Sequence, residues 1–207
     1  MKVFTAGLAT LVLAAGAAYA ATEAADESPS ELVQRVAEAM LKDLDANRAE
    51  YRQNPAKVGE LVEKHLLPHF DTRYAAQRVL GKHWRNATEE QRERFIDAFY
   101  QSMLKNYGSA LAEFTGDRLK VFPSKVGADD KIAIVRTEVK RSNGTSVPVN
   151  YVLRRTPEGW KAWDVVIEGI SYVKSFREDF STEIDQKGLD AVIQRMEQGG
   201  KPAPAAG

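Results

Sequence analysis

The sequence predicts an α+β domain in which N-terminal helices and a C-terminal helix pack on a curved antiparallel sheet of about four strands. Between residues 32 and 111, apolar side chains recur at steps of three and four, which is the period of a helix. Between residues 119 and 168 the period changes to two, as in half-buried strands, and the helical period returns from residue 173. Because a curved sheet covered by helices on one side tends to enclose a cavity, we expect an apolar pocket.

Residues 1–20 have the features of a cleavable signal peptide. The positive charge of Lys2 precedes an apolar run from Val3 to Ala15, and Ala18-Tyr19-Ala20 matches the small-residue pattern of a cleavage site. The run is shorter than the roughly 20 apolar residues needed to span a bilayer, so a membrane anchor is disfavoured. The signal peptide predicts an exported, soluble protein. Because no cysteine follows the cleavage position, we expect no lipid anchor there.

Charge and cysteine content exclude several classes of function. Lysine plus arginine number 29 and aspartate plus glutamate also number 29, so no net charge attracts nucleic acid or an anionic membrane. The absence of cysteine excludes disulfides, thiol nucleophiles and cysteine-ligated metals. The chain after the signal peptide is long enough for one domain, which we place at residues 21–198. Residues 199–207 are expected to be a disordered tail.

The first half of the domain contains the start and stop signals of four helices. Ser28 and Thr88 each begin a capping box, with Glu31 or Gln91 at the third helical position. The expected helices cover about residues 29–53, 58–67, 71–81 and 89–115. The breakers or caps that follow them are Asn54-Pro55, Pro68, Gly81 and Gly116.

The second half reads as a meander of strands followed by a helix. The expected strands cover residues 119–124, 131–140, 147–154 and 160–168. Asn143-Gly144 is a strong hairpin signal, and Pro157-Glu158-Gly159 forms the next turn. The alternation leaves one face of the sheet apolar and the other polar. A final helix is expected from Val173 to Gln198, with a kink at Gly188.

His65 and His69 are four residues apart, which could place two metal ligands on one helical face. Pro68 lies between them, however, and no glutamate follows the first histidine as in the motif H-E-x-x-H. Partly exposed histidines at a helix end are therefore the favoured interpretation, and no metal site is expected.

Asp164 is the residue that most merits consideration as a catalyst, because a carboxylate in an apolar cavity can abstract a proton. The alternation places Trp163, Val165 and Ile167 on one face of the strand and Asp164 on the other. If the apolar set faces inward, Asp164 faces solvent or a covering loop. A structural hydrogen-bonding role is therefore favoured, and no catalytic residue is expected.

Two apolar surfaces stand out in place of a catalytic constellation. One is a stripe about three turns long on the fourth helix, formed by Phe95, Phe99, Met103 and Tyr107. The other is a strand surface formed by Val135, Val149, Tyr151, Val165 and Ile167. A filled hydrophobic core would contain the same residues, and composition does not distinguish it from a lined cavity.

Two stretches carry more specific motifs. The first includes Pro68-His69-Phe70-Asp71, Arg73-Tyr74-Ala75, Val79-Leu80-Gly81, Trp84, Ala87-Thr88, Gln91-Arg92, Phe95, Phe99 and Tyr107. The second covers residues 160–173 with the core D-V-x-I-E-G-I-S, followed by Phe176-Arg177 and Gly188-Leu189. Together they resemble the MlaC family, the periplasmic phospholipid-binding or toluene-tolerance family, over essentially the whole mature chain. Trp163 stands where that family commonly has Tyr or a similar residue.

The resemblance implies an NTF2-like or cystatin-like fold whose pocket, between sheet and helices, holds the acyl chains of a phospholipid. It implies a soluble periplasmic carrier between an outer-membrane lipoprotein complex and an inner-membrane ABC-transporter complex, which maintains outer-membrane lipid asymmetry. We expect a monomer that is not an enzyme, that binds no nucleic acid and that has no cofactor besides its lipid cargo. The residues expected to bind the lipid are Phe95, Phe99, Met103, Tyr107, Val135, Val149, Tyr151, Val165, Ile167 and Phe176.

Two other functions are compatible with the sequence. An NTF2-like enzyme acting on a small hydrophobic substrate would use Asp164 or Tyr151, and a substrate screen with Asp164→Asn would identify it. A periplasmic adaptor with a solid core would yield no lipid on extraction.

Overall fold

The order of the elements confirms the α+β class. The computed structural model describes residues 27–54, 57–112, 119–140 and 144–200, and for residues 107–112 it describes the helical backbone only. The helices before the sheet are α2 (Pro29–Gln53), α3 (Lys57–His65), the 3-10 helix η1 (Leu67–His69), α4 (Thr72–Leu80), α5 (His83–Asn86) and α6 (Glu89–Ala112). The strands are β1 (Leu119–Val121), β2 (Ile132–Lys140), β3 (Ser146–Thr156), β4 (Gly159–Ile167) and β5 (Ile170–Ser171), followed by α7 (Tyr172–Lys187) and α8 (Leu189–Glu197). The predicted signal peptide lies outside the described residues.

Both predicted capping boxes are confirmed. The Ser28 N–H donates to Glu31 Oε2 at 2.9 Å, and the Glu31 N–H donates to Ser28 Oγ at 3.3 Å. The Thr88 N–H donates to Gln91 Oε1 at 3.0 Å, and the Gln91 N–H donates to Thr88 Oγ1 at 3.1 Å. Each box satisfies N–H groups that the start of a helix leaves without an intrahelical partner. The short helix α5 was not predicted from the sequence.

Asp43 connects three segments of the helical layer. The helix α2 leaves helical geometry at Asn47, where φ is −123°. Asp43 precedes this bend, and its carboxylate accepts from the Tyr51 hydroxyl beyond the bend at 2.9 Å. It also accepts from Lys64 at 2.8 Å, and it lies 2.9 Å from His65 Nε2 of α3. The carboxylate therefore holds the two parts of α2 and the end of α3 together.

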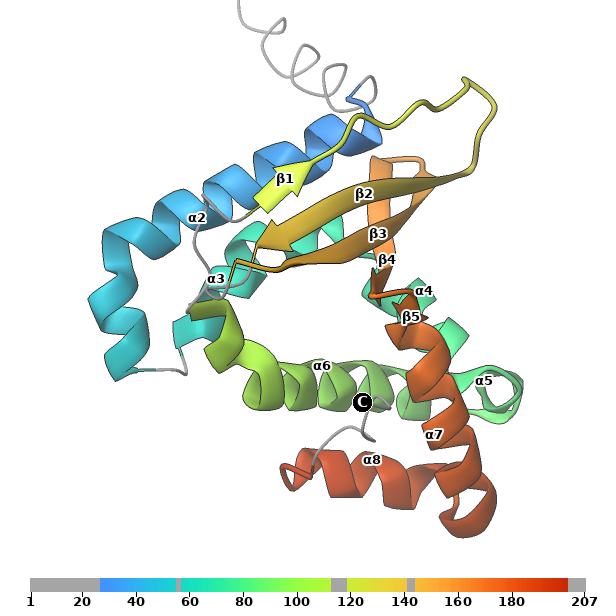
Figure 1. Cartoon of the computed structure of the whole chain (residues 1–207). Coiled ribbons are helices and arrows are strands. Elements are labelled where there is room, and N and C mark those ends of the chain that lie inside the picture. Colours follow the sequence, from blue (N-terminus) through green and yellow to red (C-terminus); the bar gives the residue numbers. More distant parts are fainter. Residues whose placement is uncertain (1–26, 55–56, 113–118, 141–143, 201–207) are drawn as a thin grey trace, which may run out of the picture.

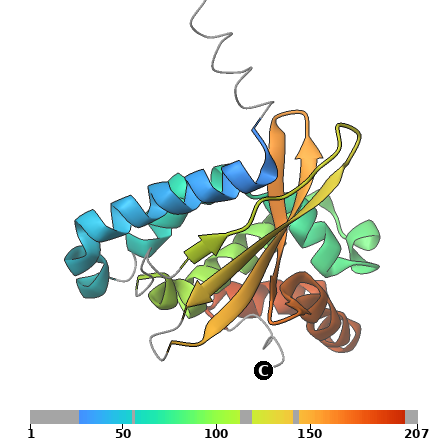
Figure 2. The same ribbon diagram turned by 45° about the horizontal axis from the view of Figure 1, so that its top comes forward.

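Within the described residues, the sheet has five antiparallel strands in the order β1-β2-β3-β4-β5. The four predicted strands are all present, and β5 is a short addition after the turn at Glu168-Gly169. Figure 1 shows β5 at the corner where the sheet passes into α7. The long strands β2, β3 and β4 form a twisted ribbon, and α2 lies along one side of it (Figure 2).

A β-bulge interrupts the pairing of β3 with β4. Val152 lies opposite Asp164, but the next residue, Leu153, lies opposite Ala162, so Trp163 is the extra residue. In a regular strand, residues two positions apart, such as Ala162 and Asp164, lie on the same face. Here they pair with the consecutive residues Leu153 and Val152, so they lie on opposite faces. The bulge therefore changes which face the alternate residues of β4 occupy.

Buried apolar residues of the described chain form three clusters. One joins α2 to the sheet through Leu32, Val36, Ala133, Val135, Leu153 and Trp160. A second joins α2 to α3 through Met40, Leu41, Leu44, Tyr51, Val58, Leu61 and Val62, with Tyr100 and Leu104 of α6 packed against it. A third joins α4, α6, α7 and α8, and we call it the helical cluster. In Figure 1, α6 passes below the sheet and α8 lies beneath α6.

The predicted C-terminal helix is divided at Gly188, where the kink was expected. Gly188 has φ +83°, a conformation that side-chain-bearing residues rarely adopt, so α7 ends there and α8 begins. The helix α8 then folds back onto α6, and the Ser102 hydroxyl of α6 donates to the Gly200 carbonyl at 2.8 Å. Gly199 and Gly200, which the sequence assigned to the tail, are thus held against the domain, and residues 201–207 lie outside the described part.

Candidate functional site

The strand residues of the predicted lipid-binding set lie side by side on one face of the sheet. This inner face is the one that packs on α2 through Val135 and Leu153. In one row across the strands, Val135, Tyr151 and Val165 lie opposite one another. In the next row, Val149 lies opposite Ile167, with Thr137 on its other side. We call Val135, Val149, Tyr151, Val165 and Ile167 the inner-face block.

Part of the inner-face block retains accessible surface although it faces inward. Val135 is fully buried, whereas Val149, Val165 and Ile167 are half-buried and belong to none of the three clusters described above. Burial raises the pKa of Tyr151, and yet its side chain also retains accessible surface. These residues lie on the face that packs on α2 and still have accessible surface, so the described core does not cover them completely.

The polar side chain beside the block, that of Thr137, is engaged within the sheet. Thr137, which lies between Val149 and the edge strand, is only 1 % exposed. Its hydroxyl donates to the Val149 carbonyl at 2.5 Å, so it has no need of a ligand oxygen. Apart from the Tyr151 hydroxyl, the block presents aliphatic side chains, so it is suited to a hydrocarbon chain.

The helical members of the predicted set lie in the helical cluster. Phe95 and Phe176 are 0 % and 2 % exposed, and Phe99 and Met103 are half-buried against them. The rings of Phe95 and Phe180 are 5.4 Å apart, and those of Phe99 and Phe176 are 5.2 Å apart. The side chain of Tyr107 lies outside the described residues. None of the three clusters contains both strand members and helical members of the predicted set. No ring contact between described residues joins the two groups.

Asp164 has the structural role that the strand pattern favoured. Its side chain is 4 % exposed and lies on the face opposite the inner-face block. One carboxylate oxygen accepts from the Ser171 hydroxyl at 2.6 Å, and the other accepts from the Val173 N–H at 3.0 Å. Both oxygens are thus engaged at the start of α7, where the carboxylate supports the N-cap residue Ser171.

The extra residue of the bulge, Trp163, contacts α4. Its ring meets the Tyr74 ring edge to face at 5.3 Å, and the Arg78 guanidinium lies 5.9 Å from its centre. The aromatic residue at this position therefore anchors β4 to α4.

The histidines do not form a metal site in the described part of the chain, where no group of three potential ligands is present. His65 contacts the Asp43 carboxylate at 2.9 Å. Burial is the main cause that lowers the pKa of His69. His83 lies 3.6 Å from the Asp185 carboxylate. Each histidine thus has a local structural explanation.

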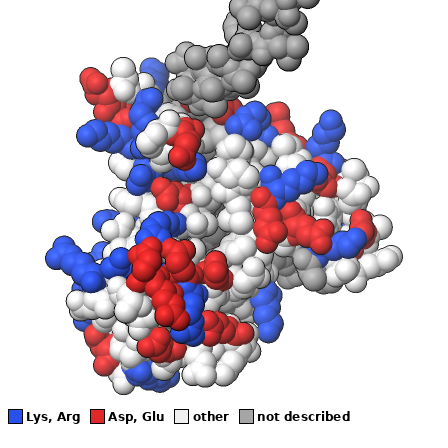
Figure 3. Space-filling view, turned by 180° about the vertical axis from the view of Figure 1, so that it is seen from behind, with Lys and Arg blue, Asp and Glu red and all other residues white. Residues whose placement is uncertain are grey.

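The charged surface shows no single sign. On the face opposite to that of Figure 1, lysine and arginine are intermixed with aspartate and glutamate, and uncharged surface lies between them (Figure 3). This distribution agrees with the balanced charge of the sequence. Within the described residues, no helix has the length and apolar character needed to cross a bilayer.

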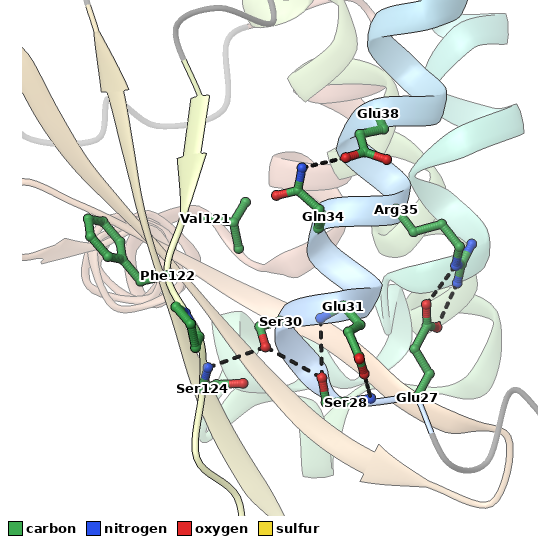
Figure 4. A pocket seen from close by; sticks show the side chains of 11 residues that line it. Glu27, Ser28, Ser30, Glu31, Gln34, Arg35, Glu38, Val121, Phe122 and Ser124 are labelled. Atoms are coloured by element: carbon green, nitrogen blue, oxygen red, sulfur yellow. Dashed lines mark hydrogen bonds and ion pairs between the residues drawn. The ribbon is translucent and has the colours of Figure 1, made fainter.

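A groove of about 770 Å³ lies between the first turns of α2 and the end of β1, and it is unsuited to an acyl chain (Figure 4). Three carboxylates line it, and each is engaged with a neighbour. Glu27 receives two hydrogen bonds from Arg35, at 2.7 and 2.8 Å. Glu31 belongs to the capping box, and Glu38 accepts from Gln34 at 2.6 Å. Covering these charged groups with hydrocarbon would remove their remaining water, which is costly.

Two residues near the block were not in the predicted set. Thr137 shares its face, as the period-two pattern of β2 indicates. Ile170 lies opposite Ile167 on β5, and only the hairpin formed at Glu168-Gly169 places it there. Glu-Gly is not one of the pairs preferred in two-residue hairpins, so Gly169 was the one local signal for this turn.

Comparisons with known proteins agree with this geometry. The sequence model of the MlaC protein family matches residues 34–198. The chain is 27% identical over 180 residues to an intermembrane phospholipid transport system binding protein of Haemophilus influenzae, covering 86% of this chain and 84% of that protein. It is 33% identical over 175 residues to a toluene tolerance protein of Pseudomonas putida, covering 84% and 81%. A phospholipid-binding protein from Ralstonia solanacearum, solved in complex with a phospholipid, superposes with a TM-score of 0.77 at 25% identity, covering 84% of this chain and 97% of that one.

Proposed function

The chain belongs to the MlaC family, and on that premise we propose that it is a periplasmic carrier that holds a phospholipid by its acyl chains. The observation that carries the proposal is the inner-face block. It is an apolar surface that faces inward, and the described core does not cover it completely. The Ralstonia solanacearum protein, which shares the fold, was solved with a phospholipid bound.

We propose that Val149, Tyr151, Val165 and Ile167 contact the acyl chains directly, because these side chains retain accessible surface. Phe99 and Met103, which are half-buried, are the helical residues best able to contact a chain as well. Phe95, Phe176 and Val135 are fully packed and would support the walls from behind.

Transfer free energies explain how such a carrier works without an energy source of its own. Moving one methylene from water to an apolar site is worth about 0.8 kcal/mol, so two chains of roughly 30 methylenes would gain about 24 kcal/mol. That exceeds the practical ceiling of about 18 to 21 kcal/mol for non-covalent binding. The lipid comes from a bilayer, however, where its chains are already dry, and the exchange between bilayer and pocket is nearly balanced.

Because the exchange is nearly balanced, the direction of transfer has to come from partner proteins. A partner shifts the equilibrium only by as much as its affinity differs between the loaded and the empty carrier. We propose that the partners are an outer-membrane lipoprotein complex and an inner-membrane ABC-transporter complex, and that the transfer maintains outer-membrane lipid asymmetry. The signal peptide predicted at residues 1–20 and the absence of cysteine from the sequence fit a carrier that crosses the periplasm.

The experiment that tests this function follows phospholipid from vesicles to the protein. Mature protein stripped of lipid is incubated with vesicles that contain a radiolabelled phospholipid, and the two are separated by gel filtration. We expect label to elute with the protein in a fixed molar ratio. Label that stays entirely with the vesicles would refute the proposed function.

A further inference from the structure

Ile170 is an exposed apolar side chain at the end of the inner sheet face. It is 45 % exposed, and the other large apolar side chains of similar exposure in the described chain are Ile132 at 49 % and Ile134 at 58 %. Ile132 and Ile134 alternate with Ala133 and Val135, which face α2, so they lie on the outer face. Ile170 is thus the exposed isoleucine that belongs to the inner side of the sheet.

The strand register connects Ile170 to the inner-face block. Ile170 lies directly opposite Ile167, so the two side chains share a face. Ile167 lies opposite Val149, and Tyr151 is the next residue of β3 on that face. The exposed fraction of these side chains increases from Val135, which is buried, through the half-buried members of the block to Ile170, which is exposed. The inner face therefore offers a continuous apolar surface from the interior to the solvent.

The backbone around Ile170 is held on both sides. Before it, the turn residues Glu168 and Gly169 both have positive φ, at +52° and +86°, and the Glu168 N–H donates to the Pro148 carbonyl at 3.0 Å. After it, the Ser171 hydroxyl donates to the Asp164 carboxylate at 2.6 Å. The isoleucine is therefore presented by a fixed hairpin rather than by a free loop.

We infer that Ile170 forms the rim of the lipid-binding surface, and that an acyl chain passes over it when a phospholipid enters or leaves the carrier. The inference rests on the proposed phospholipid-carrier function. A chain that leaves a bilayer exposes methylenes to water until it reaches the interior, and an apolar side chain at the rim covers some of them during passage. Ile170 would therefore affect the rates of uptake and release more than the amount of lipid held at equilibrium.

The test compares two substitutions that place the same carboxylate on opposite faces of the sheet. Ile170→Asp places a carboxylate at the rim of the inner face. Ile134→Asp is the matched control at an exposed isoleucine of the outer face. Mature protein stripped of lipid is mixed with vesicles of phosphatidylethanolamine and phosphatidylglycerol that contain a phospholipid with a fluorescent acyl chain. The rate of uptake and the final amount of bound lipid are both recorded, and circular dichroism verifies that each variant is folded.

We expect Ile170→Asp to slow uptake roughly ten-fold, as loss of cover for about two methylenes would do, with an equal final amount of bound lipid. The control should match the wild type. If Ile170→Asp disturbs folding, Ile170→Ser makes the same comparison with a smaller polar side chain. Uptake by a folded Ile170 variant within two-fold of the wild type, or equal slowing by Ile134→Asp, would overturn the inference alone. A wild-type protein that takes up no lipid would overturn the proposed function together with it.

Discussion

The backbone N–H of Val173 donates a hydrogen bond of 3.0 Å to the Asp164 carboxylate, which joins the strand β4 to the first turn of α7. The bond is possible because Asp164 lies on the face of β4 opposite to its neighbour Val165, a member of the inner-face block. A negative charge at a helix start also interacts favourably with the exposed N–H groups there. Asp164 is therefore part of the scaffold that joins β4 to α7.

We predict that Asp164→Ala destabilises the fold without changing lipid content. The substitution removes two hydrogen bonds to a buried carboxylate, and the free energy of unfolding should fall by about 2 to 4 kcal/mol, measured by urea denaturation. Phospholipid extracted per folded molecule should equal that of the wild type. Loss of bound lipid with unchanged stability would mean instead that Asp164 contacts the cargo or a substrate.

A second prediction concerns the centre of the inner-face block. Val149→Asp should abolish lipid retention, because a carboxylate facing the acyl chains loses its water when lipid binds. The protein should remain folded, since the Val149 side chain is only half-buried and belongs to none of the three core clusters. Thin-layer chromatography of solvent extracts measures the lipid, with Ile134→Asp on the outer face as the control. A normal phospholipid content in Val149→Asp would show that this face does not line the lipid site.

Phe95 permits a test of which helical residues meet the lipid. It is 0 % exposed and packs on Phe99 and Phe180, so Phe95→Ala should reduce the free energy of unfolding by about 3 to 5 kcal/mol. Bound lipid stabilises the folded state, and this increment should be the same in Phe95→Ala as in the wild type if Phe95 contacts only protein. Thermal unfolding with and without lipid measures the increment. A smaller increment in the variant would place Phe95 in the lipid site.

Stability at acid pH should depend on Asp43. Hydrogen bonds from His65 and Lys64 hold the pKa of Asp43 well below its ordinary value, and those from Tyr51 and Asn47 act in the same direction. Because the pKa is lower in the folded chain than in the unfolded one, where it is about 3.9, the stabilisation is complete above that pH. It is lost as the pH falls through the folded pKa.

Asp43→Asn should therefore lower the free energy of unfolding by about 1 to 3 kcal/mol at neutral pH, and its difference from the wild type should narrow below about pH 4. Urea denaturation at several pH values measures the difference. Asp45→Asn is the matched control, because the Asp45 side chain is 63% exposed and its pair with Arg48 lies at the surface. The control should change stability by less than about 1 kcal/mol. An Asp43→Asn difference that is independent of pH would contradict the assignment.

Much of the fold could be predicted because its signals are local. The capping boxes at Ser28 and Thr88 set where α2 and α6 begin, and the positive φ of Gly188 explains the break after α7. The alternation in β2, β3 and β4 predicts which residues form the inner-face block. Such features depend on neighbours within a few residues, which the sequence shows directly.

The remaining features depend on contacts between distant segments. The stripe containing Phe95 and Phe99 is visible as a helical face, but the period does not say that α7 and α8 cover it. The bulge was not predicted: the alternation grouped Trp163 with Val165 and Ile167, whereas the pairing of β3 with β4 makes Trp163 the extra residue. The role of Asp43 depends on α3 returning beside α2. These arrangements are decided by tertiary packing.

The most direct test of the central claim is the mass of the protein as a host produces it. The mature chain is purified from the periplasm of a Gram-negative host without added lipid or detergent, and its mass is measured by native mass spectrometry. We predict a mass that exceeds the polypeptide by that of a bound phospholipid, and that returns to the polypeptide mass after denaturation. A native mass equal to that of the bare polypeptide would contradict the account.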